Sequence, residues 1–416
     1  MTEAAFKTSL AVTFEAVILS LSAIPAHAQY GSLPIGSMTA GTSETCPGGG
    51  WYYYTGSRGR QYVNCFSTTV TGCAHAQDAG LDYGYLNPVG IVPNVTQALG
   101  VIVMHNGSGG TAPNGDNLGV PDGDFGFADY YFKNGYVIVQ LAWNFPWQQL
   151  LNPWPISSSP MGNVQQGACR PATFFNWAFN NIYLATVYNT TSNPHAGFCA
   201  QGFSAGDAAT TYSMSYYAPP SGGQWWFDAV VLVSGPPLSD IRQGCYVSST
   251  GGHYADVSVC GGGESWCHYT SPLNWTRHVY YTDATASVQN WTNDQSCNND
   301  PSGTSGTSNT RWWQESIVDD GTNSPVFSYP NTKVSAWLCR GVTTGPTNNS
   351  SSQGYLYYQQ VGATPPLSLD VWAVDGCPND EGVAGGTVAS TGVNGMTAIE
   401  LDMAGVYGSS TGQCRH

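Results

Sequence analysis

The chain has 416 residues, of which 26 are acidic and 11 are basic, so its formal net charge is −15. A surface this acidic excludes nucleic acid as a partner, because binding to phosphates needs clustered Lys and Arg. The apolar content of 41% excludes a disordered chain. Beyond residue 30 there is no run of 18 apolar residues, so no membrane insertion is predicted.

The N-terminus has the pattern of an export signal. An apolar run at 16–24 ends at Pro25, and Ala26-His27-Ala28 supplies small residues at the positions that a signal peptidase reads. We therefore expect residues 1–28 to be a signal peptide and the protein to be secreted, to the extracellular space or the periplasm. The acidic residues Glu3 and Glu15 are unusual in such a signal, and a buried amphipathic helix is the alternative.

After the signal, residues 29–60 are rich in Gly, Ser, Thr and Tyr and are predicted to form an extended arm. From residue 61 onward, short runs of apolar, β-branched and aromatic residues alternate with helix-compatible stretches. Strands are expected at 81–86, 101–104, 136–141, 197–199, 227–233, 334–338 and 367–374. Helices are expected at 171–186, 205–217, 310–318, 353–361 and 396–406. Strand–helix alternation predicts an α/β fold, a mostly parallel sheet with helices on both faces, within one domain at 61–416.

One stretch, at about 243–308, interrupts this alternation with four cysteines and a Gly/Ser-rich tail. We interpret it as a disulfide-bonded cap inserted over the sheet. All 12 cysteines follow residue 45 and none forms a C-x-x-C pair, which favours disulfides in an oxidising compartment over metal binding. Cysteine spacing does not determine the pairing, although Cys65/Cys73 and Cys260/Cys267 are candidates for short local loops.

The sharpest motif is Gly202-Phe203-Ser204-Ala205-Gly206, a G-x-S-x-G between an apolar strand and a predicted helix. This is the context of a nucleophile elbow, in which a serine hydroxyl stands at the N-terminus of a helix. The positive end of the helix dipole there favours a developing negative charge. Ser204 is therefore the candidate nucleophile.

A glycine-rich loop, His105-Asn106-Gly107-Ser108-Gly109-Gly110, follows the strand at 101–104. Glycines allow backbone N–H groups to approach a substrate carbonyl closely. The loop therefore supplies Gly107, Ser108 and Gly109 as candidate oxyanion-hole residues, together with Ala205 after the nucleophile. His105 precedes the hole-forming backbone, so we expect it to shape the loop and not to act as a base.

At these two motifs the chain resembles the secreted α/β-hydrolase-fold proteins of the esterase and lipase superfamily, over about residues 62–405. The resemblance implies an α/β-hydrolase-type sheet, a serine nucleophile, a two-N–H oxyanion hole and hydrolysis of an ester. It also implies that no cofactor and no metal take part.

The sequence departs from that superfamily where the triad acid and histidine would stand. Residues 340–369, after the penultimate strand, contain no Asp or Glu, and the loop at 375–383 contains no His. Asp375, Asp380 and Glu381 in that loop are interpreted as solvated charges, with proton acceptance in an acidic medium as the alternative. Asp207 is interpreted as a residue that stabilises the helix N-terminus.

Three explanations of the missing base remain open. His416, two residues after Cys414, would be the base if a disulfide held it near the site. A cap histidine (His253, His268 or His278) would otherwise have to reach over it. In the third explanation the site is catalytically silent. The sequence therefore predicts a secreted serine hydrolase for a small acyl ester or an acylated polysaccharide, with a hydrolase-fold binding or structural protein as the alternative.

Overall fold

A computed structural model of the protein describes most of the chain after residue 30. The described residues are 31, 33–74, 76, 78–107, 109–114, 126–148, 163–218, 227–239, 316–318, 325–339, 350–363, 366–378, 382–405 and 414. The expected signal peptide at 1–28, the expected cap at 243–308 and His416 lie outside this set. None of the described helices is long and apolar enough to cross a membrane.

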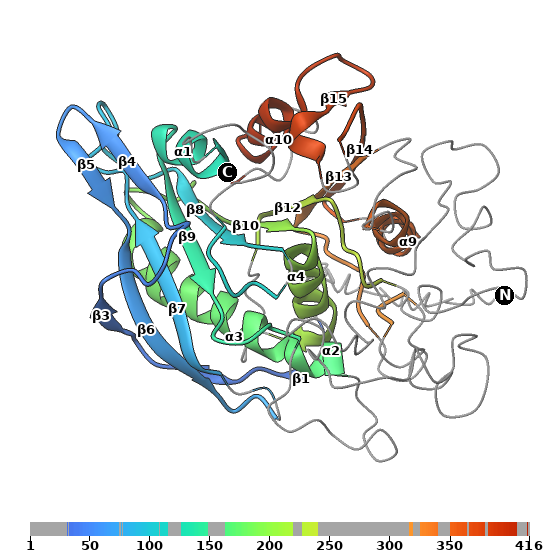
Figure 1. Cartoon of the computed structure of the whole chain (residues 1–416), viewed down its shortest axis with the longest axis horizontal. Coiled ribbons are helices and arrows are strands. Elements are labelled where there is room, and N and C mark those ends of the chain that lie inside the picture. Colours follow the sequence, from blue (N-terminus) through green and yellow to red (C-terminus); the bar gives the residue numbers. More distant parts are fainter. Residues whose placement is uncertain are drawn as a thin grey trace, which may run out of the picture.

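The centre of the fold is an 11-stranded sheet (Figure 1). Its strands follow the order β15-β14-β13-β12-β10-β8-β9-β7-β6-β2, and β3 also pairs with β6. Their bounds are β2 Ser37–Met38, β3 Thr42–Glu44, β6 Asn64–Thr71, β7 Asp78–Leu86, β8 Gly100–His105, β9 Tyr136–Ala142, β10 Gly197–Phe203, β12 Ala229–Val233, β13 Lys333–Cys339, β14 Ser368–Asp375 and β15 Thr387–Val388.

Six neighbouring strands, in the order β9, β8, β10, β12, β13 and β14, run parallel to one another. Strand β7 pairs with β9 antiparallel. Every residue of β8, β9, β12 and β13 is buried, as expected for parallel strands covered on both faces. The apolar runs of the sequence predicted these strands for that reason. The expected α/β-hydrolase-type sheet with helices is confirmed.

Helices cover both faces of the sheet. One face carries α3 (Cys169–Ala178), a π-helical continuation (Phe179–Val187), α4 (Ala205–Tyr216) and α9 (Ser350–Ala363). The other carries α1 (Gly126–Lys133) and α10 (Gly395–Met403). A short helix α2 (Asn163–Gly167) precedes α3, and a 3-10 turn spans Val383–Gly385. The expected helix at 171–186 is thus an α-helix that changes to i→i+5 hydrogen bonding, as in the 2.8 Å bond from Tyr188 N–H to Tyr183 O.

Two expected elements differ in the structure. Residues 316–318, the described part of the expected helix at 310–318, form a turn. The arm at 29–60 is extended but does not stand apart from the domain. Its strands β2 and β3 pair with β6, because the edge of the sheet offers free backbone groups to an extended chain. Strand β1 (Leu33–Pro34) pairs with β11 (Tyr217–Ala218) in a separate two-stranded sheet.

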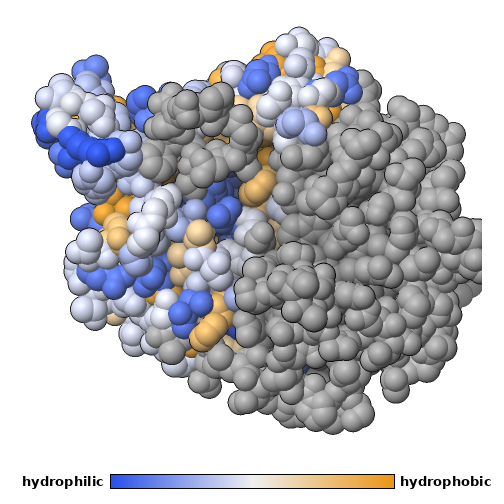
Figure 2. All heavy atoms as spheres, viewed as in Figure 1, coloured by the Kyte–Doolittle hydropathy of each residue, from blue (hydrophilic) through white to orange (hydrophobic). Residues whose placement is uncertain are grey.

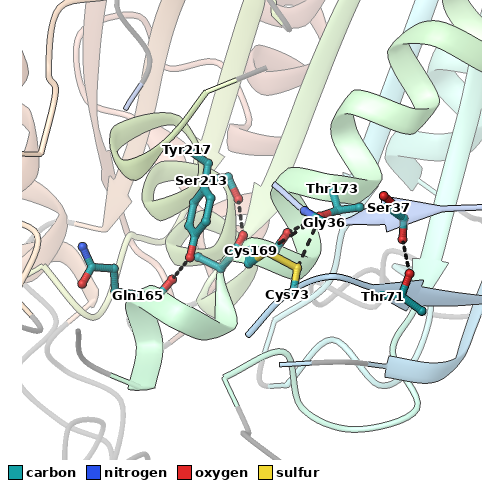
Figure 3. The surroundings of a disulfide bond; sticks show 10 residues. Gly36, Ser37, Thr71, Cys73, Gln165, Cys169, Thr173, Ser213 and Tyr217 are labelled. Carbon is teal, nitrogen blue, oxygen red and sulfur yellow. Dashed lines mark hydrogen bonds between the residues drawn. A yellow bond between two sulfur atoms is a disulfide. The ribbon is translucent and has the colours of Figure 1, made fainter. Parts of the chain in front are cut away.

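Four disulfides join cysteines of the described residues: Cys46–Cys65, Cys73–Cys169, Cys199–Cys414 and Cys339–Cys377. The expected local loop Cys65/Cys73 is therefore wrong, and Cys260/Cys267 lies outside the described residues. Cys73–Cys169 ties the end of β6 to α3 (Figure 3). Beside it, the Thr173 hydroxyl donates to Cys169 O at 2.7 Å and accepts the Gly36 N–H at 2.8 Å. The bridge and these bonds fix the arm against the helix layer.

A buried ion pair lies between the sheet and α10. Lys333 Nζ, at the start of β13, is 2.6 Å from Asp402 Oδ1 and 3.5 Å from Asp370 Oδ2. The indole N–H of Trp337 donates to Asp402 Oδ2 at 3.0 Å. Burial raises the pKa of Asp402, and Lys333 opposes that rise. The charges are retained inside the protein because each has a partner.

Candidate active site

Ser204 lies at the turn between β10 and α4, at the carboxyl end of the parallel strands. Its backbone has φ 52° and ψ −120°, a region that residues other than glycine rarely occupy and that costs about 1–3 kcal/mol. The turn is held by two backbone bonds of 2.9 Å, from Ser204 N–H to Val233 O and from Asp207 N–H to Ser204 O. Ser204 is therefore held in the strained geometry of a nucleophile elbow.

The two glycines of the motif are required by close contacts. A Cβ at Gly202 would lie 2.3 Å from Asp207 Oδ1, and a Cβ at Gly206 would lie 2.3 Å from His105 O. Neither space admits a methyl group. The G-x-S-x-G spacing thus follows from how tightly the strand, the helix and the glycine-rich loop meet at this turn.

The glycine-rich loop contacts the elbow directly. A Cβ placed on Gly107 would lie 3.1 Å from the Cβ of Ser204, and Ala205 is fully buried beside it. Gly107 N–H donates to Asn106 Oδ1 at 2.8 Å, so this donor must leave the Asn106 side chain before it can bind an oxyanion. Gly109 is anchored through its carbonyl, which accepts the Trp147 N–H at 2.9 Å. Ser108 lies outside the described residues, and the oxyanion-hole roles remain predictions.

His105 occupies the end of β8 beneath this loop. Its Nδ1 is 2.9 Å from Asn106 O, and its Nε2 accepts the indole N–H of Trp143 at 2.9 Å. The ring is 1% exposed, and burial lowers its pKa to about 4. The Nε2 lone pair is used by Trp143, so His105 shapes the loop and is not available as a general base.

Asp207, the third residue of α4, lies in the first turn of the helix, where the sequence led us to expect an acidic residue that stabilises the N-terminus. Its Oδ1 accepts the N–H of Val233 on the neighbouring strand at 3.2 Å. The side chain is completely buried, and this burial raises the pKa of its carboxyl well above the usual value. Val233 in turn accepts the N–H of Ser204 through its carbonyl, so Asp207 supports the Ser204 turn through β12.

The described residues contain two histidines, His105 and His195. His195 is exposed and precedes β10, at the opposite end of that strand from Ser204. An imidazole base would therefore have to come from outside the described residues. After the expected signal peptide, the histidines there are His75, which precedes the elbow, and His253, His268, His278 and His416, which follow it. Cys414, two residues before His416, is bridged to Cys199, five residues before Ser204 on the same strand.

The loops that carry the acid and the histidine in the resembled superfamily are joined here by a disulfide. Cys339 ends β13, Cys377 follows β14, and their Cα atoms are 6.0 Å apart. Asp375 ends β14 and is half-buried, while 380 and 381 lie outside the described residues. Within the described part of the chain, no three His, Cys, Asp or Glu residues gather in a way that would hold a metal ion.

Comparison with known proteins gives structural likeness only. No protein-family model and no curated protein matches the sequence. Among solved structures, brefeldin A esterase, a bacterial homologue of human hormone-sensitive lipase, covers 90% of this chain and 72% of its own at 11% identity and a TM-score of 0.37. An acetyl xylan esterase from Paenibacillus sp. R4 covers 82% of each chain at 10% identity and a TM-score of 0.39. An esterase from Thermogutta terrifontis covers 72% of this chain and 79% of its own at 12% identity and a TM-score of 0.31.

These identities and TM-scores are too low to support any inference about activity or substrate. The class of the protein follows instead from its own sheet order, its helix layers and the elbow at Ser204. The chain has an α/β-hydrolase-type fold, as its resemblance to that superfamily implied.

Proposed function

We propose that the protein is a secreted serine hydrolase that cleaves carboxylic esters, either small acyl esters or acyl groups carried by a polysaccharide. The backbone of Ser204 carries this proposal. A strained serine persists only where the surrounding structure holds it, and such strain gathers at catalytic sites. The contact of Gly107 with Ser204 adds a backbone suited to binding an oxyanion.

The reaction would proceed through an acyl-enzyme. Ser204 Oγ attacks the ester carbonyl carbon while its proton passes to a general base, and the carbonyl oxygen becomes an oxyanion. The N–H of Ala205 and one N–H of residues 107–109 would hold this oxyanion. The tetrahedral intermediate expels the alcohol, which takes up the proton from the base. Water then hydrolyses the acyl-enzyme through a second oxyanion in the same hole.

The enclosure of the elbow favours a short acyl chain. Ser204 is 1% exposed and Ala205 is not exposed at all. We therefore expect p-nitrophenyl acetate to be cleaved faster than p-nitrophenyl laurate, judged by kcat/KM. Faster cleavage of the laurate ester would contradict the preference for small acyl groups without removing the serine from its role.

His416 remains the proposed base, with His253, His268 and His278 as alternatives. A working base needs a nitrogen within about 2.6–3.2 Å of the hydroxyl that it deprotonates. The Nε2 of His105 accepts a hydrogen bond from Trp143, and the loops that usually carry the acid and the histidine contain neither residue at those places. A catalytically silent site used for binding is therefore the second candidate function.

A fluorophosphonate probe separates these two functions. The full-length secreted protein would be labelled between about pH 3 and pH 8. We expect labelling of the wild type and loss of labelling in Ser204→Ala, while Ser67→Ala, altered on the distant strand β6, should label normally. Absence of labelling throughout this pH range, in protein with an intact thermal transition, would favour the silent site.

The base is assigned by comparing His416→Gln with Gln variants of the three cap histidines. The variant that loses labelling at neutral pH identifies the base, and equal labelling of all four would exclude an imidazole from these positions. Mass spectrometry of the secreted protein should show an N-terminus near Gln29, and retention of residues 1–28 would contradict a cleaved signal.

A further inference from the structure

The hairpin of β4 (Tyr53–Gly56) and β5 (Gly59–Tyr62) presents two different faces. The rings of Tyr52 and Tyr54 pack against Phe132 of α1, with centroids 5.5 and 5.2 Å apart. Side chains alternate along an extended chain, so Tyr53 points away from α1. Its ring lies 5.6 Å from that of its cross-strand partner, Tyr62. The inward face therefore anchors the hairpin, and the outward face is not needed for that packing.

The outward face carries a cation held by aromatic rings. The guanidinium carbon of Arg60 lies 3.6 Å from the centroid of the Tyr53 ring and 5.2 Å from that of Tyr62. The guanidinium also donates hydrogen bonds to the side chains of Tyr53 and Tyr62. Because a guanidinium has five N–H donors, others remain at its edge for a ligand. Arg60 is exposed, and Tyr62 is 55% exposed, more than any other large hydrophobic residue described.

The segment that contains this hairpin carries a charge opposite to that of the whole chain. No Asp or Glu occurs in residues 45–77, whereas Arg58 and Arg60 are two of only 11 basic residues in a chain of net charge −15. Arg58 is exposed beside the turn and donates to Gly90 O. In Figure 2 the projecting end of this hairpin, which Figure 1 labels β4 and β5, forms a strongly hydrophilic surface.

We propose that Tyr53, Arg60 and Tyr62 form a binding surface for an acidic polysaccharide that contains uronic acid residues. The guanidinium edge of Arg60 would donate to the uronate carboxylate, and the exposed ring of Tyr62 would contact the C–H face of a neighbouring sugar. Two arginines suit a polymer of spaced carboxylates. This surface lies outside the elbow and does not depend on catalysis there.

Binding of the full-length protein to polygalacturonate tests the proposal, with amylose as the neutral comparison. We expect affinity for polygalacturonate alone, weakening as salt rises from about 50 mM to about 200 mM. Arg60→Ala should weaken it by about tenfold, the loss expected for a hydrogen bond to a charged group. Tyr62→Ala should also weaken it. Lys133→Ala, which removes an exposed positive charge from α1, is the matched control and should bind normally.

Three outcomes would contradict the proposed binding surface. These are an affinity for amylose equal to that for polygalacturonate, unchanged polygalacturonate binding by Arg60→Ala, and tighter binding of an oligonucleotide than of polygalacturonate through the same residues. The thermal transition of each variant shows whether it is folded. Ser204→Ala should bind polygalacturonate as the wild type does, so failure of the serine hydrolase proposal and failure of this one give different results.

Discussion

The indole N–H of Trp143 donates to Nε2 of His105 at 2.9 Å, immediately beneath the loop that contacts Ser204. That bond requires an unprotonated Nε2, and the ring's other nitrogen lies 2.9 Å from Asn106 O, which accepts a hydrogen bond from Nδ1–H. A neutral imidazole is thereby built into the support of the glycine-rich loop. The loop and the end of β8 are held by the same side chain.

This arrangement predicts a stability that depends on pH. Burial lowers the pKa of His105 from 6.5 to about 4, so between these values the unfolded chain binds a proton that the native state does not. Stability should rise with pH across this window, by about 3 kcal/mol from this residue, and should be lost as pH falls through it. Urea unfolding from pH 4 to pH 7 should show a smaller increase for His105→Gln than for the wild type. Identical pH dependence would show that His105 is not the buried neutral group.

Gly206→Ala should disrupt the contact between the elbow and the glycine-rich loop. The added methyl carbon would lie 2.3 Å from His105 O and 2.7 Å from Asn106 O, both backbone atoms. We expect a loss of about 1–3 kcal/mol in the free energy of unfolding. If the loop carries an oxyanion donor, the rate of fluorophosphonate labelling should fall by roughly a hundredfold. Gly49→Ala, where no atom lies within 4 Å of the new carbon, is the control. Unchanged stability of Gly206→Ala would mean that the loop moves freely.

Two variants of Asp207 distinguish the effect of its hydrogen bond to Val233 from the effect of its buried charge. Burial raises the pKa of its carboxyl above 3.8, so the native state holds a proton that the unfolded chain releases as pH rises. Its contribution is therefore present at low pH and lost as pH rises toward the native pKa. Asp207→Asn keeps an acceptor for Val233 N–H and cannot ionise, so it should be more stable than the wild type at neutral pH. Asp207→Ala should lose about 1–3 kcal/mol by leaving that N–H unpaired. Equal stability of the Asn and Ala variants at neutral pH would contradict the role of the bond.

Lys333 and Asp402 should depend on one another. Lys333→Met leaves a carboxylate buried beside Trp337 and should cost about 3–5 kcal/mol in chemical denaturation. The double variant Lys333→Met/Asp402→Leu removes both charges and should recover much of that loss. If the loss of stability in the double variant equals the sum of the losses in Lys333→Met and Asp402→Leu, the pair is not coupled.

Local sequence predicted the centre of this fold well. Strands such as β8 and β12 are buried on both faces, and such strands have sequences that are almost continuously apolar. The elbow was also predictable, because the contacts at Gly202 and Gly206 leave only glycine at those two positions. In these cases the structural requirement falls on residues that are close together in the sequence, so a local sequence pattern predicts it.

Features that join distant parts of the chain could not be predicted in this way. Nothing near Lys333 marks it as a buried residue, since its partner Asp402 is 69 positions away. The pairing of Cys73 with Cys169 spans 96 positions, and the nearer Cys65 was an equally reasonable partner by spacing. The base proposed for Ser204 is of the same kind, because its position would depend on how segments remote from Ser204 return to it.

The disulfide between Cys199 and Cys414 makes the centre of the sheet depend on a residue from a distant part of the chain. Cys199 lies in the central strand β10, and the backbone of Cys414 is seated against Gly100 and Gly197, where a methyl group would meet its carbonyl at 2.6 and 2.4 Å. The contacts of the central strand are therefore complete only when a residue 215 positions later in the chain has been added. A chain that ends before Cys414 would therefore leave the fully buried Cys199 without its disulfide partner.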